Sequence, residues 1–391
     1  MLSEAKNKIL TQVSAGTPMG DYLRRFWHPV AGAAEFDEKS VRAIRLMGED
    51  LTLFKDMSGT YGLVDRHCPH RRADLSYGFV EEVGIRCNYH GWRMDETGAC
   101  VEQPFEDTVN PNNKSKDRCA ITAYPVREVA GLLFAYMGPL PAPVLPKYDI
   151  FMRRDGRFKI TQYPRLDCNW FVSAENSVDS THLQLLHQEP PEAKFKPLDS
   201  TRGYIDDVLA SDYYATDYGI MKKRTYHGGT TDEHPMIFPL WLRTRSAIWM
   251  RTPIDDEHTN HWTFDFKQGA PTDEIQVEYL APFKDPPDAI HPVAKFDNLP
   301  RHGWPLSEDV VMWETQGVIA DRTQEHLGAS DKGVALLRKM MFEEIERVQR
   351  GEDPLGVFRD ERIIDTNLEK SINMTYPTGH VAKTIPVKEP V

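Results

Sequence analysis

Two short segments of the chain each carry one cysteine and one histidine at close spacing. The first holds Cys68 and His70, and the second holds Cys87 and His90, with sixteen residues between the two pairs. Two thiolates and two imidazoles can surround one tetrahedral zinc ion. They can equally hold a [2Fe–2S] cluster, with the cysteines on one iron and the histidines on the other. Both interpretations predict a metal centre built from two loops.

The residues around these ligands favour the iron–sulfur interpretation. The two loops, Arg66-His67-Cys68-Pro69-His70-Arg71 and Cys87-Asn88-Tyr89-His90-Gly91-Trp92, resemble the paired cluster loops of the Rieske proteins. The resemblance implies that Cys68, His70, Cys87 and His90 bind one [2Fe–2S] cluster. His67 falls outside the pattern and is interpreted as a structural or surface residue. A zinc-stabilised binding module would instead be colourless and free of iron.

A second group of possible metal ligands lies further along the chain. His182 and His187 are five residues apart, and Asp179 precedes the first of them by three. Two imidazoles and one carboxylate on one face of Fe(II) form the facial triad of non-haem oxygenases, which leaves positions open for oxygen and substrate. Helical geometry puts Asp179 beside His182 but leaves His187 well off that face, so a helix must end or bulge before His187. Spacing leaves the third ligand open.

Taken with the cluster loops, the pattern Asn176-x-x-Asp179-x-x-His182-x4-His187 resembles the large, oxygen-activating component of the Rieske non-haem iron oxygenases. In that family the two histidines bind a mononuclear iron, so the resemblance implies His182 and His187 as ligands. It also implies that Asp179 links the two centres by a hydrogen bond to a cluster histidine of a neighbouring subunit. Asn176 resembles an asparagine that lies close to the iron without a firm ligand role.

The family's third iron ligand is a carboxylate on a late helix. The matching segment of this sequence runs from Ser307 to Gln316. Within it we predict Asp309 as the third ligand, with Glu308 as the alternative. Either carboxylate could instead simply favour the positive N-terminus of that helix.

The opening segment from Gly16 to Pro29 resembles the phthalate-dioxygenase-like branch of the family. The resemblance implies a terminal oxygenase that uses O2 and reductase-supplied electrons to hydroxylate the ring of an aromatic carboxylate such as phthalate or benzoate. The alternative is an aromatic O-demethylase that acts on a methoxybenzoate or a lignin-derived methoxy acid with the same irons. A Rieske electron carrier would need only the N-terminal part of the chain, so the length argues against it.

Cofactors and partners follow from the same resemblance. We expect one [2Fe–2S] cluster and one mononuclear Fe(II) in each subunit. The chain lacks a Gly-x-Gly-x-x-Gly fingerprint and a cysteine set for a second cluster, so NAD(P)H and flavin are expected on a separate flavin or ferredoxin-type reductase. An electron path between subunits demands a heterologous contact that closes into a ring, and the family expectation is a head-to-tail homotrimer.

A carboxylate-bearing substrate calls for cations in the C-terminal half. The densest groups there are Lys222-Lys223-Arg224 and the pair Arg243 and Arg245. Because arginine can bind a carboxylate with two parallel hydrogen bonds, Arg243 and Arg245 are the candidates for substrate binding. The alternative is that they are solvated charges on a strand face.

Composition excludes several other classes. The 391 residues carry a formal net charge of −12 with dispersed Lys and Arg, which gives no electrostatic footprint for nucleic acid. The chain has no apolar run long enough for a membrane span. Its five cysteines, an odd number without disulfide spacing, are typical of a reducing compartment, so a cytoplasmic protein is expected.

The pattern of strands and turns predicts an α+β protein in three parts. Residues 1–24 read as a helical segment, 25–146 as an all-β Rieske domain with strands near 43–46 and 51–54, and 147–391 as an α+β catalytic domain. The proline-rich run 138–146 can continue neither a helix nor a strand ladder, so it marks the boundary. In the catalytic domain we expect an antiparallel sheet that includes 247–251 and 261–266, covered by helices near 307–320 and 330–350.

Overall fold

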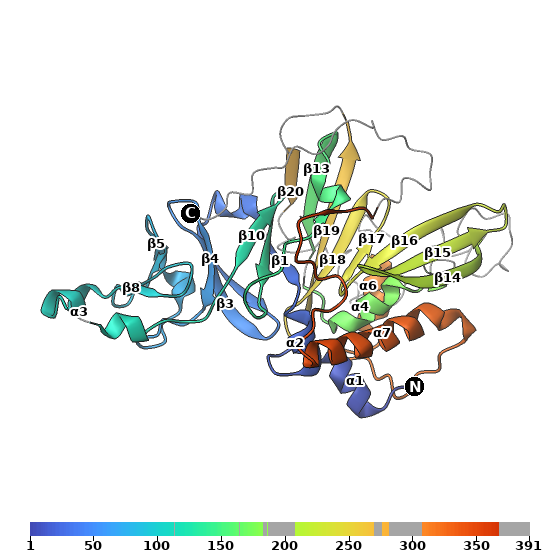
Figure 1. Cartoon of the computed structure of the whole chain (residues 1–391), viewed down its shortest axis with the longest axis horizontal. Helices are drawn as coiled ribbons and strands as arrows, with labels where there is room; N and C mark the ends of the chain where they lie inside the picture. The colour runs from blue at the N-terminus through green and yellow to red at the C-terminus, as the bar shows by residue number, and fades with distance from the viewer. Residues whose placement is uncertain are drawn as a thin grey trace.

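The computed structural model of the chain describes residues 1–112, 114–163, 165–182, 186, 208–269, 276–280 and 307–366. Within these residues the strands form three small sheets in the N-terminal part, a large sheet in the C-terminal part and one short pair. The molecule is elongated, with the small sheets toward one end and the large sheet toward the other (Figure 1). The predicted order, an all-β part followed by a sheet covered by helices, is confirmed.

The N-terminal part is built from short antiparallel strands, which agrees with the predicted strands near 43–46 and 51–54. The first sheet has the order β2-β3-β4-β9, the second β5-β6-β7-β8 and the third β1-β11-β10. Pro125 separates β9 from β10, because proline has no N–H to donate to a ladder. The strands are β1 Trp27–Gly32, β2 Val41–Leu46, β3 Glu49–Lys55, β4 Tyr61–Asp65, β5 Phe79–Val80, β6 Ile85–Arg86, β7 Arg93–Met94, β8 Cys100–Glu102, β9 Ala123–Tyr124, β10 Val126–Val129 and β11 Leu132–Tyr136.

The C-terminal part is organised around one eight-stranded sheet. Its order is β14-β15-β16-β17-β18-β19-β13-β20. Neighbouring strands are antiparallel, as predicted, except that β20 runs parallel to β13 at one edge. The strands are β13 Gly156–Gln162, β14 Val208–Thr216, β15 Gly219–Tyr226, β16 Thr231–Ile237, β17 Trp241–Arg243, β18 Ala247–Pro253, β19 Thr259–Gln268 and β20 Gln276–Leu280, and the separate pair is β12 Lys147–Tyr148 with β21 Ile363–Ile364.

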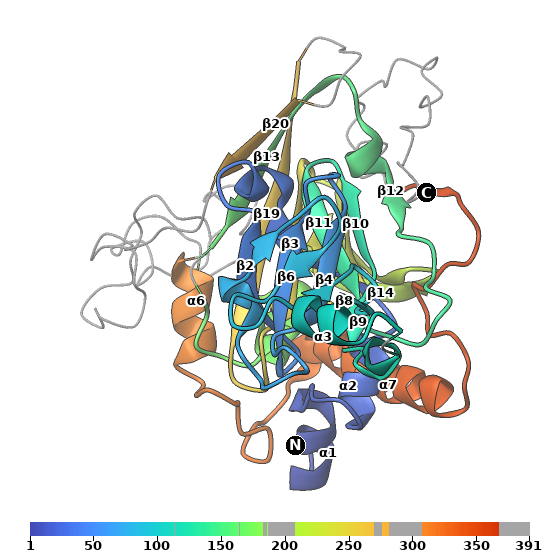
Figure 2. The same cartoon turned by 90° about the vertical axis from the view of Figure 1, so that its left-hand side faces the viewer.

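Helices cover the lower part of this sheet (Figures 1 and 2). The predicted helix near 330–350 is α7, whereas α6 ends at Glu314, earlier than predicted, because turns that include Gly317 at φ 95° follow it. In the described part of the chain no helix is long and apolar enough to cross a membrane. The helices are α1 Glu4–Thr11, α2 Pro18–Leu23, α3 Pro104–Val109, α4 Trp170–Ser177, α6 Ser307–Glu314 and α7 Lys332–Gln349, with short 3-10 turns η1 Ala33–Phe36, η2 Leu75–Tyr77, η3 Ser115–Arg118, η4 Asp149–Met152 and η7 Ala329–Asp331.

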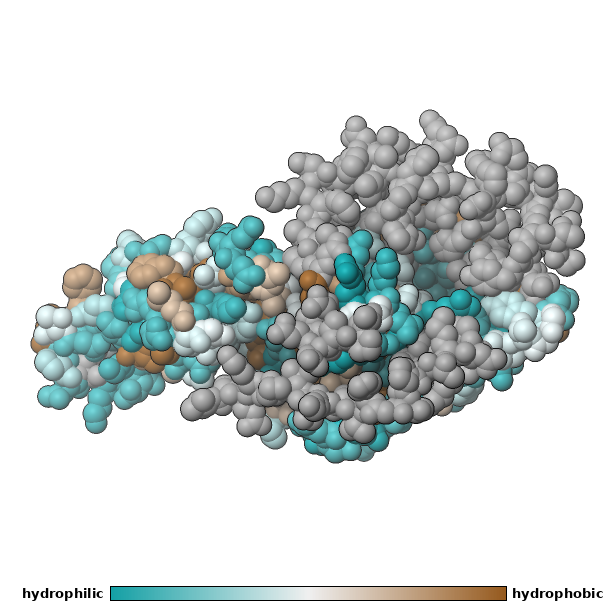
Figure 3. Space-filling view, turned by 90° about the horizontal axis from the view of Figure 1, so that it is seen from above, coloured by the Kyte–Doolittle hydropathy of each residue, from teal (hydrophilic) through white to brown (hydrophobic). Residues whose placement is uncertain are grey.

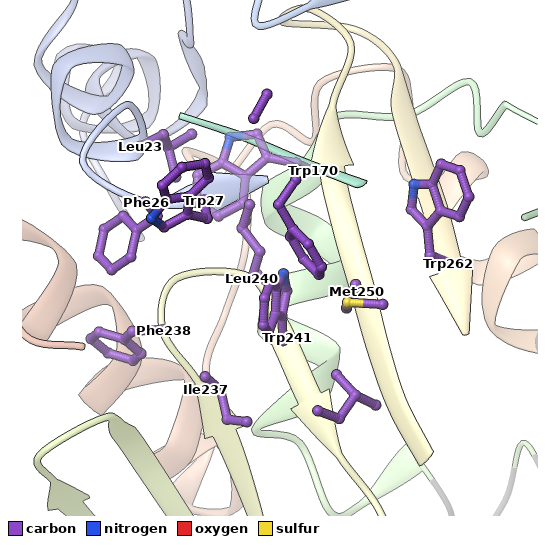
Figure 4. Packing of buried hydrophobic residues seen from close by; sticks show 14 of the residues in the cluster. Leu23, Phe26, Trp27, Trp170, Ile237, Phe238, Leu240, Trp241, Met250 and Trp262 are labelled. Atoms are coloured by element: carbon purple, nitrogen blue, oxygen red, sulfur yellow. The ribbon is translucent and has the colours of Figure 1, made fainter. Parts of the chain in front are cut away.

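The N-terminal segment packs against the C-terminal part, since α2 contacts α7 and α1 contacts α4. Figure 4 shows Leu23 and Trp27 beside Trp170 and Trp241, in one buried cluster that extends across the chain. Burial of such large side chains contributes about 2 kcal/mol each, so this cluster holds α4 firmly against the sheet. The division at residues 24 and 146 remains a proposed one.

Candidate metal centres

The two loops that carry the cysteines have the same backbone pattern. The N–H of Cys68 donates to the carbonyl of Ala73, at 2.8 Å, and the N–H of Arg72 donates back to the carbonyl of Cys68, at 2.9 Å. The second loop repeats both bonds at the same spacing, starting from Cys87, at 2.9 and 3.0 Å. Each loop is therefore a closed turn that presents one cysteine and, two or three residues later, one histidine.

The closing residue of each loop has left-handed backbone geometry. Arg72 has φ 62° and Gly91 has φ 77°. Glycine adopts this region freely, whereas another residue costs about 1 kcal/mol there, so the loop around Arg72 is held by its surroundings. Its guanidinium lies 3.5 Å from Asp65, and Asp65 also accepts from the N–H of His67. His67 is thus a loop residue with a backbone bond, as its place outside the motif suggested.

The four predicted cluster ligands come together. Cys68 and Cys87 are buried, and His70 and His90 lie half-buried beside each other with ring centroids 4.5 Å apart. Trp92 stacks on the His70 ring at 4.5 Å and 9°. The thiols thus lie inside and the imidazoles lie toward the surface, where electrons could enter or leave.

These residues fit a [2Fe–2S] cluster. Burial, with Cys87 beside it, raises the pKa of the Cys68 thiol to about 12, so a thiolate there needs a metal cation to balance it. The Nδ1 atom of His70 is buried and has no hydrogen-bond partner among the described residues, as expected of a metal ligand. The two buried thiols and the two outer imidazoles form separate pairs, as a cluster with the cysteines on one iron and the histidines on the other requires. The donor set therefore favours two irons over one zinc.

A second convergence lies between α4 and α6. The Nε2 atom of His182 is 3.7 Å from Oδ1 of Asp309, and the amide nitrogen of Asn176 lies within 3.3 Å of His182 and 3.1 Å of Asp309. The imidazole and the carboxylate are too far apart for a hydrogen bond between them, but a metal ion between them could bind both at ordinary lengths. Three of the predicted residues are thus brought together.

Asp179 holds the other side of the imidazole. Its Oδ2 atom is 3.1 Å from Nδ1 of His182, so Nε2 is the ring nitrogen that faces Asp309. Burial opposes ionisation of Asp179, but the hydrogen bond and charge of His182 and the N–H of Thr181 hold the pKa of the carboxyl below its usual range. The pair lies in the turn after α4, which ends at Ser177, so the predicted helical spacing of Asp179 and His182 is wrong although their contact is present.

The turn that carries Asp179 is clamped from the sheet and from α7. Lys222, buried in β15, donates to the main-chain carbonyl of Asp179 at 3.3 Å, and Tyr213 of β14 bonds Ser180 at 3.1 Å. Gly333 of α7 approaches so closely that a Cβ there would meet the carbonyl of Val178 at 2.2 Å. These contacts fix the backbone from which the carboxylate extends.

A buried ion-pair network fixes α4 itself. Glu175, next to Asn176, pairs with Arg322 at 2.6 Å and with Arg338 of α7 at 2.6 Å. Arg338 also pairs with Glu325. Because removal of one partner would leave buried charges unpaired, this network ties α4 to α7 and to the segment that carries Arg322.

A cavity of about 520 Å³ opens beside these residues. It is lined by Asn176, Asp179 and His182 on one side and by Met312 and Trp313 of α6 on another. The arrangement places open space next to the imidazole of His182, as a reaction at a metal held there would require.

Other predicted residues are not part of this convergence. His187 and the side chain of Glu308 lie outside the described residues. Arg243 is buried, donates to the carbonyls of Arg245 and Ala247 and lies 3.6 Å from Asp149, and the Arg245 side chain is exposed. Neither arginine lines the cavity, so their role in substrate binding stays a prediction that these contacts do not support.

Two buried cations near the site were not predicted from the sequence. Lys222 belongs to a run of cations in the sequence, whereas Arg251 of β18, whose charge interacts with Asp309, has no other charged residue in its strand. A single charged residue inside the mainly apolar strand Ala247–Pro253 is the signal that could have identified Arg251.

Comparison with protein families supports the cluster interpretation. Residues 26–124 match the model of the Rieske [2Fe-2S] domain, and residues 297–375 match the model described as LigXa C-terminal domain like. The match over 26–124 contains both cysteine loops.

Individual proteins are similar over most of the chain. The 5,5'-dehydrodivanillate O-demethylase oxygenase subunit of Sphingobium sp. (strain NBRC 103272 / SYK-6) is 43% identical over 93% of this chain and 85% of its own length. The phthalate 4,5-dioxygenase oxygenase subunit of Pseudomonas putida is 32% identical over 91% of this chain and 89% of its own. A solved structure of Pseudomonas putida CBB5 NdmA with caffeine, a QL mutant, shares the fold at TM-score 0.60 and 22% identity, over 89% of this chain and all of that one.

Proposed function

Because the chain belongs to the oxygenase components of the Rieske non-haem iron oxygenases, we propose that it removes the methyl group of a methoxylated aromatic acid. It is an oxygenase that depends on a [2Fe–2S] cluster, and its family implies a separate reductase and a small aromatic substrate. The observation that carries O-demethylation is the 43% identity to an O-demethylase oxygenase subunit across 93% of the chain.

We assign a mononuclear Fe(II) to the second convergence. His182 and Asp309 would hold it, with His187 as the further ligand, and Asn176 would lie beside it as a hydrogen-bond donor to Asp309. Bound there, the iron would supply the activation of O2. The chain's own part is to keep Nε2 of His182 directed at the metal, which the bond from Nδ1 to Asp179 does.

The overall reaction balances with two electrons, which one NADH supplies. A methoxyarene, O2, NADH and a proton give a hemiacetal, water and NAD⁺, because one oxygen atom enters the C–H bond of the methyl group and the other is reduced. The hemiacetal C–O bond then breaks, its hydroxyl proton moves to the aryl oxygen, and a phenol and formaldehyde leave. NAD(P)H and flavin bind to the reductase in this proposal.

We propose a head-to-tail homotrimer in which Asp179 meets a cluster histidine of the neighbouring subunit. Figure 1 places the sheet that contains β5 and β8 at one end of the molecule and α4 in the other half. A contact between subunits would therefore bring the cluster loops of one subunit near Asp179 of the next. At the end of the molecule that carries the small sheets, Figure 3 shows hydrophobic residues scattered among hydrophilic ones. The exposed apolar side chains of Phe79, Phe105 and Val109 in this part of the chain support such a contact. Its test is the mass of the assembly in solution.

The unpaired state of all five cysteines supports our placement of the enzyme in the cytoplasm. Export of a periplasmic form in a secretion assay would contradict this placement.

The test of the function uses the iron-loaded protein with a flavin and ferredoxin-type reductase, NADH and O2. We expect 3- or 4-methoxybenzoate, or a larger methoxylated aromatic acid, to give the phenol and one formaldehyde for each NADH consumed. Conversion of none of these ethers, with active reductase present, would refute O-demethylation.

Ring hydroxylation of phthalate or benzoate is the second candidate. The 32% identity to a phthalate 4,5-dioxygenase oxygenase subunit supports it. A cis-dihydrodiol or a ring-hydroxylated acid, without formaldehyde, would identify this reaction in the same assay.

A further inference from the structure

The large sheet buries a pair of polar side chains on the face that α4 and α6 cover. Arg251 of β18 and His261 of β19 are directly opposite in the strand register, so their side chains lie side by side on one face. Met250 and Trp262, which alternate with them, belong to the main apolar core on the other face. Arg251 and His261 are nevertheless 1% and 0% exposed.

Three of the polar atoms of this pair have no hydrogen-bond partner in the part of the chain that the structure describes. Both ring nitrogens of His261 and Nε of Arg251 are buried without a hydrogen bond, although Nη1 of Arg251 donates to Ser177 at 2.7 Å. Buried polar atoms are nearly always bonded, and each exception calls for an explanation. Three such atoms on two adjacent side chains indicate a site that a ligand completes.

Aromatic rings surround the imidazole. The ring centroids of Tyr163, Trp249 and Trp313 lie 5.5, 5.9 and 6.2 Å from that of His261. The guanidinium of Arg251 lies 5.9 Å from the Trp313 ring. Flat walls around a few convergent polar atoms suit an aromatic ring that carries a polar substituent.

The charge of the pair favours an anion. Burial lowers the pKa of Arg251 to about 10, which leaves it charged near neutral pH, and Asp309 is the carboxylate that acts on it. If Asp309 binds iron, the metal balances the charge of this carboxylate, and the charge of Arg251 is left for an anionic ligand. His261 is neutral, because burial and Arg251 hold its pKa well below the usual range, so its ring offers one donor and one acceptor.

This pair lies next to the cavity of the iron site. Trp313 lines that cavity with Asn176 and His182, and the same ring stacks against His261 at an interplanar angle of 27°. Movement of the Trp313 side chain would open a connection between the cavity and the pair formed by Arg251 and His261. Side-chain rearrangement of this kind is common when a ligand binds.

We propose that Arg251 and His261 bind the carboxylate of the aromatic substrate and so determine the preference for aromatic acids, a role first considered for Arg243 and Arg245. The inference rests on the proposed function, because it takes the substrate to be an aromatic acid oxidised at this iron. The Nε–H of Arg251 and one N–H of His261 would donate to the two carboxylate oxygens, and the ring would lie against Trp249 and Trp313.

The test measures binding rather than turnover. Calorimetric titration of the cluster- and iron-loaded protein under nitrogen would use 3-methoxybenzoate and its neutral amide, 3-methoxybenzamide. We expect Arg251→Met and His261→Phe to weaken binding of the acid at least about tenfold, since each removes a hydrogen bond to a charged group, and to change binding of the amide less than about threefold. Arg245→Met, which removes an exposed cation, is the matched control and should change neither.

The outcomes separate this inference from the proposed function. If wild type binds and demethylates the acid but both variants bind it as tightly as wild type, the inference is wrong and the function stands. Equal weakening for acid and amide would also overturn it, because it would show a packing role. If wild type binds neither probe and oxidises no aromatic acid, the proposed function fails as well. If a variant does not retain its cluster absorption, Arg251→Lys or His261→Asn, which keep a polar side chain, replaces it. Arg251→Lys must then weaken binding of the acid more than binding of the amide.

Discussion

The Nδ1 atom of His182 lies 3.1 Å from the carboxylate of Asp179, and this contact decides which edge of the imidazole faces Asp309. The arrangement is that of a metal-binding histidine held by a carboxylate, which fixes the ring and its tautomer. Asp179 also lines the cavity, together with His182.

Asp179→Asn should leave both metal centres in place and lower coupled turnover about a hundredfold, because the amide keeps the size of the side chain but loses the charge that directs His182. The measurements are iron and sulfide content and the rate at which the reduced cluster is reoxidised in a single turnover. Wild-type coupled turnover in this variant would show that Asp179 does not link the centres. Asp217→Asn, which removes an exposed carboxylate that pairs with Arg362, is the control.

The third ligand is tested by two neighbouring substitutions. Asp309→Ala should abolish retention of the mononuclear iron while the cluster absorption stays, because Asp309 is buried and lies 3.7 Å from Nε2 of His182. Glu308→Ala should retain the iron. Iron analysis of both proteins, normalised to sulfide, decides between them, and the opposite result would assign the ligand to Glu308.

Stability should depend on the network around Glu175. Glu175→Ala leaves the buried guanidiniums of Arg322 and Arg338 without this partner, so we expect the free energy of unfolding to fall by about 3 kcal/mol. Lys339→Ala, which removes an exposed pair with Glu343 at 3.7 Å, should cost less than about 1 kcal/mol. Denaturant unfolding of both variants measures the difference, and equal effects would mean that the network carries no special stability.

The cluster loops show what sequence could predict. The types and spacing of Cys68, His70, Cys87 and His90 indicated two loops, and the loops do bring the four side chains together. The matching backbone hydrogen bonds that close the two loops could not be predicted from the sequence. Arg72 adopts the left-handed backbone conformation that Gly91 adopts in the other loop, and an arginine does not indicate that conformation.

The group formed by Asn176, His182 and Asp309 shows which features the sequence pattern could not predict. The helical period predicted that Asp179 and His182 touch, but α4 ends at Ser177 and the contact comes from a turn held by Lys222. A turn fixed by residues distant in sequence has no local signal. Arg243 and Arg245 form a dense pair in the sequence, whereas Arg251 is a lone charge between Met250 and Thr252. The strand register places Arg251 on the side of the sheet that α4 covers.

His28 should make stability depend on pH. Burial lowers the pKa of His28 to about 4, although the ring keeps a 2.8 Å bond to the carbonyl of Leu23, and the unfolded value is 6.5. Because the folded pKa is the lower one, the unfolded chain binds the proton first. Stability is therefore complete above about pH 6.5 and falls as the pH drops toward 4. At pH 5 the loss relative to pH 7.5 should be about 2 kcal/mol.

The comparison that isolates this effect is His28→Gln, whose amide can still donate to Leu23. Denaturant unfolding at pH 7.5 and pH 5 should show a smaller loss in the variant than in wild type. The same loss in both proteins would assign the pH dependence to other groups.

Lys222→Met tests whether the buried ammonium positions Asp179. Lys222 has a pKa lowered to about 8, chiefly by burial, and its bond to the Asp179 carbonyl is 3.3 Å long. Methionine fills a similar volume without the desolvation cost, so global stability should change by less than about 1.5 kcal/mol. The turn would lose its hydrogen bond, and we expect cluster reoxidation in a single turnover to slow about fivefold to tenfold with iron content unchanged. Lys223→Met, one residue along the strand and on its opposite face, should leave that rate unaltered. Equal rates in Lys222→Met and wild type would mean that the contacts of Tyr213 and Gly333 hold Asp179 without help from Lys222.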